Sequence, residues 1–161
     1  MDHLWSPWRM KYIRRQRVPK GCIFCDAVQL EDGKENLIIH RGKLAYAIMN
    51  RYPYTSGHIM VVPYQHVDAF EDLDMDATAE CMRLLRDGTL AINSAYKPDG
   101  YNMGANLGST AGAGIADHIH FHLVPRWEGD TNFMSAVGET RVLPEDLCET
   151  WQRLKDAWPV G

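Results

Sequence analysis

The sequence lacks long apolar segments, and none of its apolar runs approaches the roughly 18 residues that a membrane-spanning helix needs. The first residues include Asp2 and His3 and contain no apolar core segment, so we expect no secretory signal and a cytoplasmic protein. An excess of positive charge is also missing, because 17 basic residues are outnumbered by 21 acidic ones and the net charge is -4. We therefore expect neither a nucleic acid nor a membrane among the partners.

Cysteine is scarce as well, with four residues in 161. That is too few for a disulfide scaffold, and a chain of this length can bury a core of its own. Cys22 and Cys25 form a Cys-x-x-Cys pair. In a reducing compartment such a pair indicates a metal site or a redox couple, but no thioredoxin-like βαβ pattern surrounds it. Cys81 and Cys148 fall within predicted helices, where we expect them to be packing thiols.

The hydrophobic pattern predicts a single α+β domain over residues 1–161. A helical arm is expected over 1–21; it carries six basic residues and no acid between Arg9 and Lys20, which fits either a solvated surface or a phosphate-gathering one. The core is expected over 22–135, with a charged loop after Cys25 and strands over 37–40, 44–49, 58–63 and 101–107. A last helix is expected over 144–158. The longest helix is expected over 74–95, where apolar residues recur at helical spacing at Met75, Ala79, Met82, Leu85 and Leu90.

The most informative segment runs from Asp117 to Arg126, where three of the seven histidines alternate with large apolar residues. Strict alternation predicts a half-buried strand whose successive side chains point to opposite faces. The imidazoles of His118, His120 and His122 then form one row, with neighbours roughly 6 to 7 Å apart along a phosphate-sized groove. Such a row also suits a metal, because imidazole is the commonest metal ligand in proteins.

A loop of small residues over 108–116 leads directly into this segment. Near Gly112 and Gly114 the backbone can approach a ligand closely, and its N–H groups can form a nest for an anion. The loop is not a Walker motif, because no Gly-Lys-Ser/Thr follows it. Beside three histidines, it indicates a phosphate held against imidazole.

The segment His118-Ile119-His120-Phe121-His122-Leu123-Val124 resembles the signature of the histidine-triad (HIT) nucleotide hydrolases and transferases. The similarity covers most of residues 22–135. Other stretches resemble the bacterial branch that includes the diadenosine tetraphosphate phosphorylases, namely Leu4 to Met10, Tyr52-Pro53-Tyr54, Asn106-Leu107-Gly108 and Arg126 to Phe133. The resemblance implies a HIT-like fold, with an antiparallel sheet of about five strands and two main helices, and a homodimer.

The resemblance also implies a site and a reaction. His120 would attack the α-phosphorus of a nucleotide or dinucleoside polyphosphate and form a nucleotidyl-histidine, and His122 would donate to phosphate or the leaving group. Asn50 would contact the ribose, His58 would buttress the active-site strand, and Asn106 would lie near the bridging oxygen. The nucleotide- and phosphate-binding residues implied are Asn50, His58, Asn106, Gly112, Gly114 and His122.

Zinc-containing relatives hold a structural zinc with a Cys-x-x-Cys pair, a histidine after the Val-Val-Pro strand, and the first histidine of the triad. The matching positions in this sequence are Cys22, Cys25, His66 and His118. The resemblance therefore implies a structural zinc with these four ligands.

The acceptor of the nucleotidyl group decides the name of the reaction. Orthophosphate as co-substrate gives a phosphorylase, water gives a hydrolase of dinucleoside polyphosphates or phosphoramidates, and another phosphorylated compound gives a nucleotidyltransferase. Phosphorylase-like members often carry a serine shortly before the triad, where this chain has Gly114. Phosphorolysis is our first hypothesis, hydrolysis the alternative, and a non-catalytic, zinc-stabilised nucleotide-binding or interaction module the third.

Overall fold

The computed structural model describes residues 21–130 and 145–159. The predicted N-terminal helix, its basic residues and the last residues of the predicted core lie outside these ranges. Five strands form one antiparallel sheet, as predicted, in the order β1-β2-β3-β5-β4. The strands are β1 (Ile38–Arg41), β2 (Ala45–Met49), β3 (Ile59–Pro63), β4 (Gly100–Ala105) and β5 (Phe121–Arg126).

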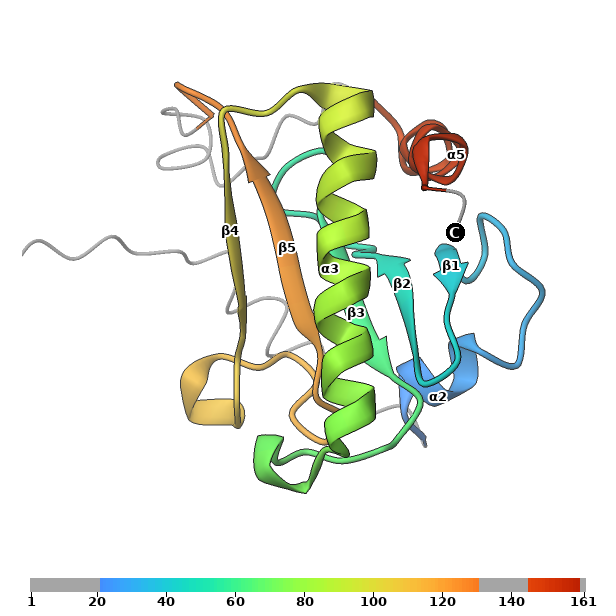
Figure 1. Cartoon of the computed structure of the whole chain (residues 1–161), viewed down its shortest axis with the longest axis vertical. Coiled ribbons are helices and arrows are strands. Elements are labelled where there is room, and N and C mark those ends of the chain that lie inside the picture. Colours follow the sequence, from blue (N-terminus) through green and yellow to red (C-terminus); the bar gives the residue numbers. More distant parts are fainter. Residues whose placement is uncertain (1–20, 131–144, 160–161) are drawn as a thin grey trace, which may run out of the picture.

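Two long helices lie on the sheet (Figure 1). Helix α3 (Met75–Tyr96) packs against β2, β3 and β5, and helix α5 (Leu147–Ala157) packs against α3 and β1. The described chain also contains a short helix, α2 (Ile23–Ala27), and the 3-10 turns η1 (Phe70–Asp72) and η2 (Ser109–Ala111). None of the described helices is long and apolar enough to cross a bilayer.

Helix α3 begins and ends within one residue of the predicted range. The Asp74 carboxylate accepts hydrogen bonds from the backbone N–H groups of Asp76 and Ala77, which caps the first turn. The helix ends at Tyr96, and the next residue, Lys97, has φ 48° and precedes Pro98. A left-handed residue followed by proline cannot continue a helix.

Four of the five apolar residues that recur at helical spacing do not lie on the buried face of α3. Met75, Ala79, Met82 and Leu90 are exposed, Met75 by 78%, and only Leu85 is buried. The buried face instead contains Gly88, where a Cβ atom would lie 2.5 Å from Ile59 Cδ1. Glycine therefore lets α3 approach β3 closely, and the buried residues of the helix are Ala77, Glu80, Cys81, Leu84, Leu85, Gly88, Ala91 and Ile92.

The strand boundaries differ from the predictions by a few residues, for local reasons. Leu37 has φ 61°, a left-handed conformation outside the strand region, so β1 begins at Ile38 rather than Leu37. The segment with the histidines enters the ladder only at Phe121, because β4 and β3 pair with it from that residue onward. The short helix α2 was not predicted, since five residues give no readable period.

Outside the site, two cysteine predictions have different outcomes. Cys81 is buried in α3, as predicted for a packing thiol. Cys148 lies in α5 but is exposed, so the prediction of a packing thiol is wrong there. The buried positions of α5 are Thr150 and Leu154 instead, and the indole N–H of Trp151 donates to the Ile38 carbonyl at 2.9 Å.

A buried carboxylate from α3 holds the turn between β1 and β2. Glu80 accepts hydrogen bonds from the backbone N–H groups of Lys43, Leu44 and Ala45 while only 6% of its surface is exposed. Burial alone would raise the pKa of Glu80, but these three donors and the charge of Arg83 hold it below its usual value. Ionised Glu80 therefore stabilises the folded chain above the pKa of the unfolded carboxyl, and this contribution is lost as the pH falls through the folded value.

Replacing Glu80 with glutamine should lower the free energy of unfolding at pH 7 by about 1.5 to 3 kcal/mol, the range for hydrogen bonds to a charged group. Urea unfolding of both proteins between pH 7 and pH 3 should show the difference shrinking as the wild-type carboxyl becomes protonated. Glu31→Gln, at an exposed carboxylate, is the matched control and should change little. An unfolding difference that stayed constant down to pH 3 would contradict the role of the ionised group.

Candidate functional site

The alternation of β3 and β5 places the histidines on the sheet face opposite α3. Ile59 and Leu123 are paired across the two strands, and both contact α3 at Gly88. Their neighbours Met60 and His122 are paired as well, and alternation turns these side chains to the other face. The imidazole cluster is therefore separated from α3 by the sheet.

His120 and His122 lie side by side, with ring centroids 4.9 Å apart and ring planes at 70°. Of the three histidines, only His122 lies within β5; His118 and His120 precede the ladder. The rings of His120 and His122 are consequently closer than the spacing predicted for a continuous strand, while His118 turns toward the cysteines. His118 and His120 are buried, 2% and 5% exposed, and His122 is half-buried.

The hydrogen bond of His120 assigns its tautomer. Its Nδ1 lies 2.9 Å from the backbone carbonyl of His118, and a carbonyl can only accept. Nδ1 therefore carries the proton and Nε2 carries the lone pair. Burial lowers the pKa of His120, against a smaller opposing effect of the His118 carbonyl, so the neutral, nucleophilic form is favoured near pH 7.

A second chain of hydrogen bonds assigns the tautomers of His58 and His122. The backbone N–H of Tyr54 donates to His58 Nδ1 at 3.1 Å, so the His58 proton is on Nε2. That nitrogen lies 2.9 Å from His122 Nδ1, which must accept. In the neutral ring, the remaining proton of His122 is then on Nε2. His58 is fully buried and lies against His122.

The other predicted nucleotide-binding residues lie at strand ends and in the loop that leads to His118. Ala105 is the last residue of β4 to pair, opposite Phe121, so Asn106 leaves the ladder beside His120. Asn50 lies at the end of β2 with its side-chain nitrogen 3.5 Å from His58 Nδ1, and its Oδ1 accepts from the Tyr52 N–H at 2.9 Å. Gly112 and Gly114 lie half-buried in the loop after η2 that returns to His118.

Cys22, Cys25, His66 and His118 converge, and their donor atoms all lie within 4.8 Å of one another. The Nδ1 atom of His118 is 3.2 Å from Cys22 Sγ, 3.7 Å from Cys25 Sγ and 3.1 Å from His66 Nδ1. Cys25 Sγ is 3.4 Å from His66 Nδ1. A tetrahedral zinc, with bonds of about 2.3 Å to sulfur and 2.05 Å to nitrogen, keeps its donors about 3.3 to 3.8 Å apart. The four separations above, 3.1 to 3.7 Å, lie close to this range, and all pairs lie within 4.8 Å, so the four residues could hold this metal.

The surroundings of the cluster favour the ligand form of His118 but, without a cation, disfavour the thiolate form of Cys25. His118 Nε2 donates to the Pro63 carbonyl at 2.9 Å, which leaves Nδ1 as the ligand nitrogen. Burial lowers the pKa of His118 and so keeps it neutral. Burial, the hydrogen bond and charge of Cys22, and the charges of Asp26 and Asp117 raise the pKa of Cys25 to about 11. A bound divalent cation would reverse this effect, because it favours the thiolate.

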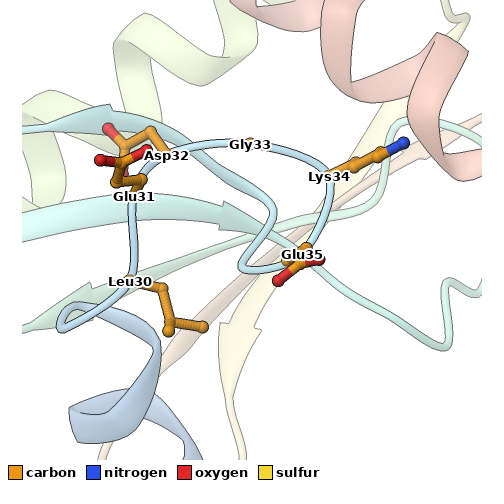
Figure 2. Close-up of a pocket in the computed structure, with 6 residues that line it drawn as sticks. All are labelled: Leu30, Glu31, Asp32, Gly33, Lys34 and Glu35. Atoms are coloured by element: carbon orange, nitrogen blue, oxygen red, sulfur yellow. The ribbon is translucent and has the colours of Figure 1, made fainter.

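A separate hollow is formed by the loop over 30–35 between α2 and β1 (Figure 2). Two side chains hold this loop: Asp32 forms an ion pair with Arg41 at 2.8 Å, and the Asn36 amide, beside the hollow, donates to the carbonyls of Ala27 and Leu30. None of the histidines lines it. The residues of this hollow are Leu30, Glu31, Asp32, Gly33, Lys34 and Glu35.

Two side chains near the histidines carried no role in the sequence prediction. The ring of Tyr54 lies 4.6 Å from the ring of His58 and 6.0 Å from that of His122, nearly parallel to the latter. The ring of Phe24 lies 4.9 Å from that of His120. The available signals were the Tyr-Pro-Tyr turn and the aromatic residue inside the Cys-x-x-Cys pair, but neither indicates contact with His120 or His122, which lie far away in the sequence.

Comparison with known proteins gives a consistent result. Residues 32–129 match the HIT domain family. The chain is 40% identical over 166 residues to the AP-4-A phosphorylase of Mycobacterium tuberculosis, covering 98% of this chain and 85% of that protein. A zinc-bound histidine triad family protein from Mycobacterium smegmatis superposes with a TM-score of 0.68 at 24% identity, over 85% and 92% of the two chains. A hypothetical histidine triad nucleotide-binding protein from Sulfolobus tokodaii gives 0.65 at 29% identity, over 84% and 88%.

Proposed function

Because the chain belongs to the HIT domain family, as its histidine motif predicted, we propose that it cleaves dinucleoside polyphosphates such as diadenosine tetraphosphate at the α-phosphate. The observation that carries the proposal is the arrangement of His120, whose Nδ1 proton is bound to the His118 carbonyl and whose Nε2 lone pair is left for attack. The similarity to an AP-4-A phosphorylase over nearly the whole chain supports the choice of substrate class.

In the first step, His120 Nε2 attacks the α-phosphorus, and the bond from that phosphorus to the bridging oxygen breaks. His122 Nε2–H donates a hydrogen bond to the departing oxygen and stabilises its negative charge, so the shortened polyphosphate leaves as an anion, while the His58 N–H holds His122 in the donor orientation. The first products are a nucleotidyl group on His120 and the shortened polyphosphate. The step needs one imidazole nitrogen with a lone pair for attack and a neighbouring imidazole N–H for the leaving oxygen. Two adjacent imidazoles of opposite tautomer meet this requirement.

In the second step, an anionic oxygen of orthophosphate attacks the same phosphorus, and the P–N bond breaks with its electron pair returning to Nε2 of His120. A nucleoside diphosphate is released, and both imidazoles are again neutral. The loop that contains Gly112 and Gly114 would lie against the phosphoryl oxygens, and it is held in shape by the Gly112 N–H, which donates to the Ser109 carbonyl at 3.0 Å. Asn50 would contact the ribose, and Asn106, which leaves β4 beside His120, would lie near the bridging oxygen.

We further propose that Cys22, Cys25, His66 and His118 hold one zinc ion. When bound, zinc would supply a structural cross-link between α2, the segment after β3 and the segment before β5, and it would take no part in the reaction steps. The donor separations and the second hydrogen bond of His118 support this assignment.

We propose orthophosphate as the acceptor of the nucleotidyl group. Water as the acceptor, and therefore hydrolysis, is the alternative. Incubating the protein with diadenosine tetraphosphate, with and without orthophosphate, separates them by product analysis. ATP and ADP formed only when orthophosphate is present would support phosphorolysis. AMP and ATP, or two ADP, formed without it would support a hydrolase, which the glycine at position 114 leaves open. Tight binding without turnover would contradict both and indicate a binding module.

A homodimer is the remaining partner we propose. The exposed apolar side chains Met75, Met82 and Leu90 lie along α3, and Met103 is exposed on the edge strand β4. A second copy of the chain would remove this apolar surface from water.

A further inference from the structure

Phe24 lies between the two cysteines and contacts two of the histidines. It is 1% exposed, and its ring centroid is 4.9 Å from that of His120 and 5.5 Å from that of His118. The interplanar angles are 49° and 76°. These are the separations of aromatic rings in contact. One buried side chain thus touches both the nucleophilic imidazole and an imidazole of the metal centre.

The other contacts of His120 leave its ring one freedom. The bond from Nδ1 to the His118 carbonyl holds one ring atom and the bond to Cβ holds Cγ, so small coupled rotations about χ1 and χ2 can still move Nε2 relative to the substrate. His122 approaches at 70° and blocks the ring on one side. Phe24 packs against it from α2. Together, His122 and Phe24 restrict the rotations of the His120 ring that the hydrogen bond still allows.

Phe24 is itself held from three directions. Its carbonyl accepts the hydroxyl of Tyr46 in β2 at 2.9 Å, and Cys22 and Cys25 on either side both supply donor atoms to the metal cluster. Helix α2 has five residues and no side-chain hydrogen bond at its N-terminus, so it has little stability of its own. Its position therefore depends on these anchors, and so does the position of the Phe24 ring.

We propose that Phe24 is a positioning residue for His120: it holds the face of the imidazole so that Nε2 stays aimed at the α-phosphorus, and it links the order of the cysteine pair to the nucleophile. The inference rests on the proposed function for its kinetic effect. Its geometric content, an imidazole whose orientation is set by Phe24, is independent of the substrate.

The kinetic test compares Phe24→Leu and Phe24→Ala with the wild-type protein, using diadenosine tetraphosphate and orthophosphate. We expect kcat to fall about 10- to 100-fold for alanine, the loss that a misplacement of about 1 Å produces, and less for leucine. KM should change less than about threefold, because a buried Phe24 orients the nucleophile rather than binding the substrate. A raised KM with unchanged kcat would overturn the proposal.

The second readout does not use activity. In wild-type protein the ring current of Phe24 should displace the imidazole C–H signals of His120 in NMR spectra, and the nitrogen signals should report a single Nδ1–H tautomer. Phe24→Leu should remove the displacement and broaden or mix the tautomer signals. Leu154→Ala, at an equally buried residue of α5, is the control; it should lower stability without altering the His120 signals or kcat.

The two readouts separate this inference from the proposed function. If wild-type protein turns over the dinucleotide but Phe24→Leu leaves both kcat and the His120 signals unchanged, the positioning role is wrong. If the wild-type protein is inactive while Phe24→Leu still disturbs His120, the positioning role stands and the reaction is wrong. Leucine keeps the core filled, so this variant carries the test if the alanine variant does not fold.

Discussion

Replacing His120 is expected to lower kcat/KM for diadenosine tetraphosphate by about 10⁴-fold or more, because the reaction then has no nucleophile. Asparagine is a sharper substitution than alanine. Its side-chain amide can donate to the His118 carbonyl, as Nδ1 of His120 does at 2.9 Å, but it offers no nitrogen lone pair for attack. Steady-state kinetics on His120→Asn and His120→Ala, with circular dichroism of both proteins, separates loss of chemistry from loss of fold.

The control is His40→Ala. His40 stacks on Trp158 with ring centroids 5.3 Å apart, has no expected role in the reaction, and should leave kcat/KM within about threefold. Rapid quenching of the wild-type reaction at alkaline pH should also show a nucleotidyl adduct by mass spectrometry, and that adduct should be missing from both His120 variants. Substantial turnover by a folded His120→Asn protein would remove the covalent mechanism, whatever the products.

The sequence was most informative where local rules act alone. The helix from Met75 was predicted within one residue from apolar residues that recur at helical spacing, and the structure shows that a capping Asp74 begins it and a left-handed Lys97 follows its end. Its buried face was not predicted, since Met75 and Met82 satisfy the helical period but α3 approaches the sheet through Gly88 and Glu80 instead. Periodicity detects only apolar side chains. The buried face of α3 instead depends on the close contact of Gly88 with Ile59 and on the backbone N–H groups around Leu44 that bind Glu80.

The site shows the same division. Alternation was enough to find the histidine segment, but it did not show that β5 begins only at Phe121. Because His118 lies before the strand, its carbonyl accepts from His120 and the His118 ring faces the cysteines. The bond between His58 and His122 joins residues 64 positions apart, and Cys22 meets His118 across 96 positions. Only family resemblance grouped these residues beforehand, because no local pattern encodes contacts at such separations.

Removing a ligand of the proposed zinc should produce the largest loss of stability among these predictions. A metal that binds only the folded chain stabilises it by about 4 kcal/mol when its free concentration is about 1,000 times Kd. Cys25→Ser should therefore lose the metal and unfold at a markedly lower temperature, and a strong chelator should move the wild-type midpoint in the same direction. Elemental analysis of wild-type protein should give about one zinc per chain. Thermal unfolding under reducing conditions measures the midpoints of the variant and of the wild type with and without chelator.

Cys148→Ser is the matched control, because this thiol is exposed on α5 and outside the cluster, so its midpoint should equal that of the wild type in both the presence and the absence of chelator. Loss of the metal should lower kcat as well as stability. Since His118 supplies both a ligand nitrogen and the carbonyl that holds His120, the folded, metal-free protein should also lose kcat at temperatures well below its own midpoint. A metal-free wild-type protein with an unchanged midpoint would contradict the zinc assignment. Lowered stability with full kcat would leave the zinc in place and separate it from the nucleophile.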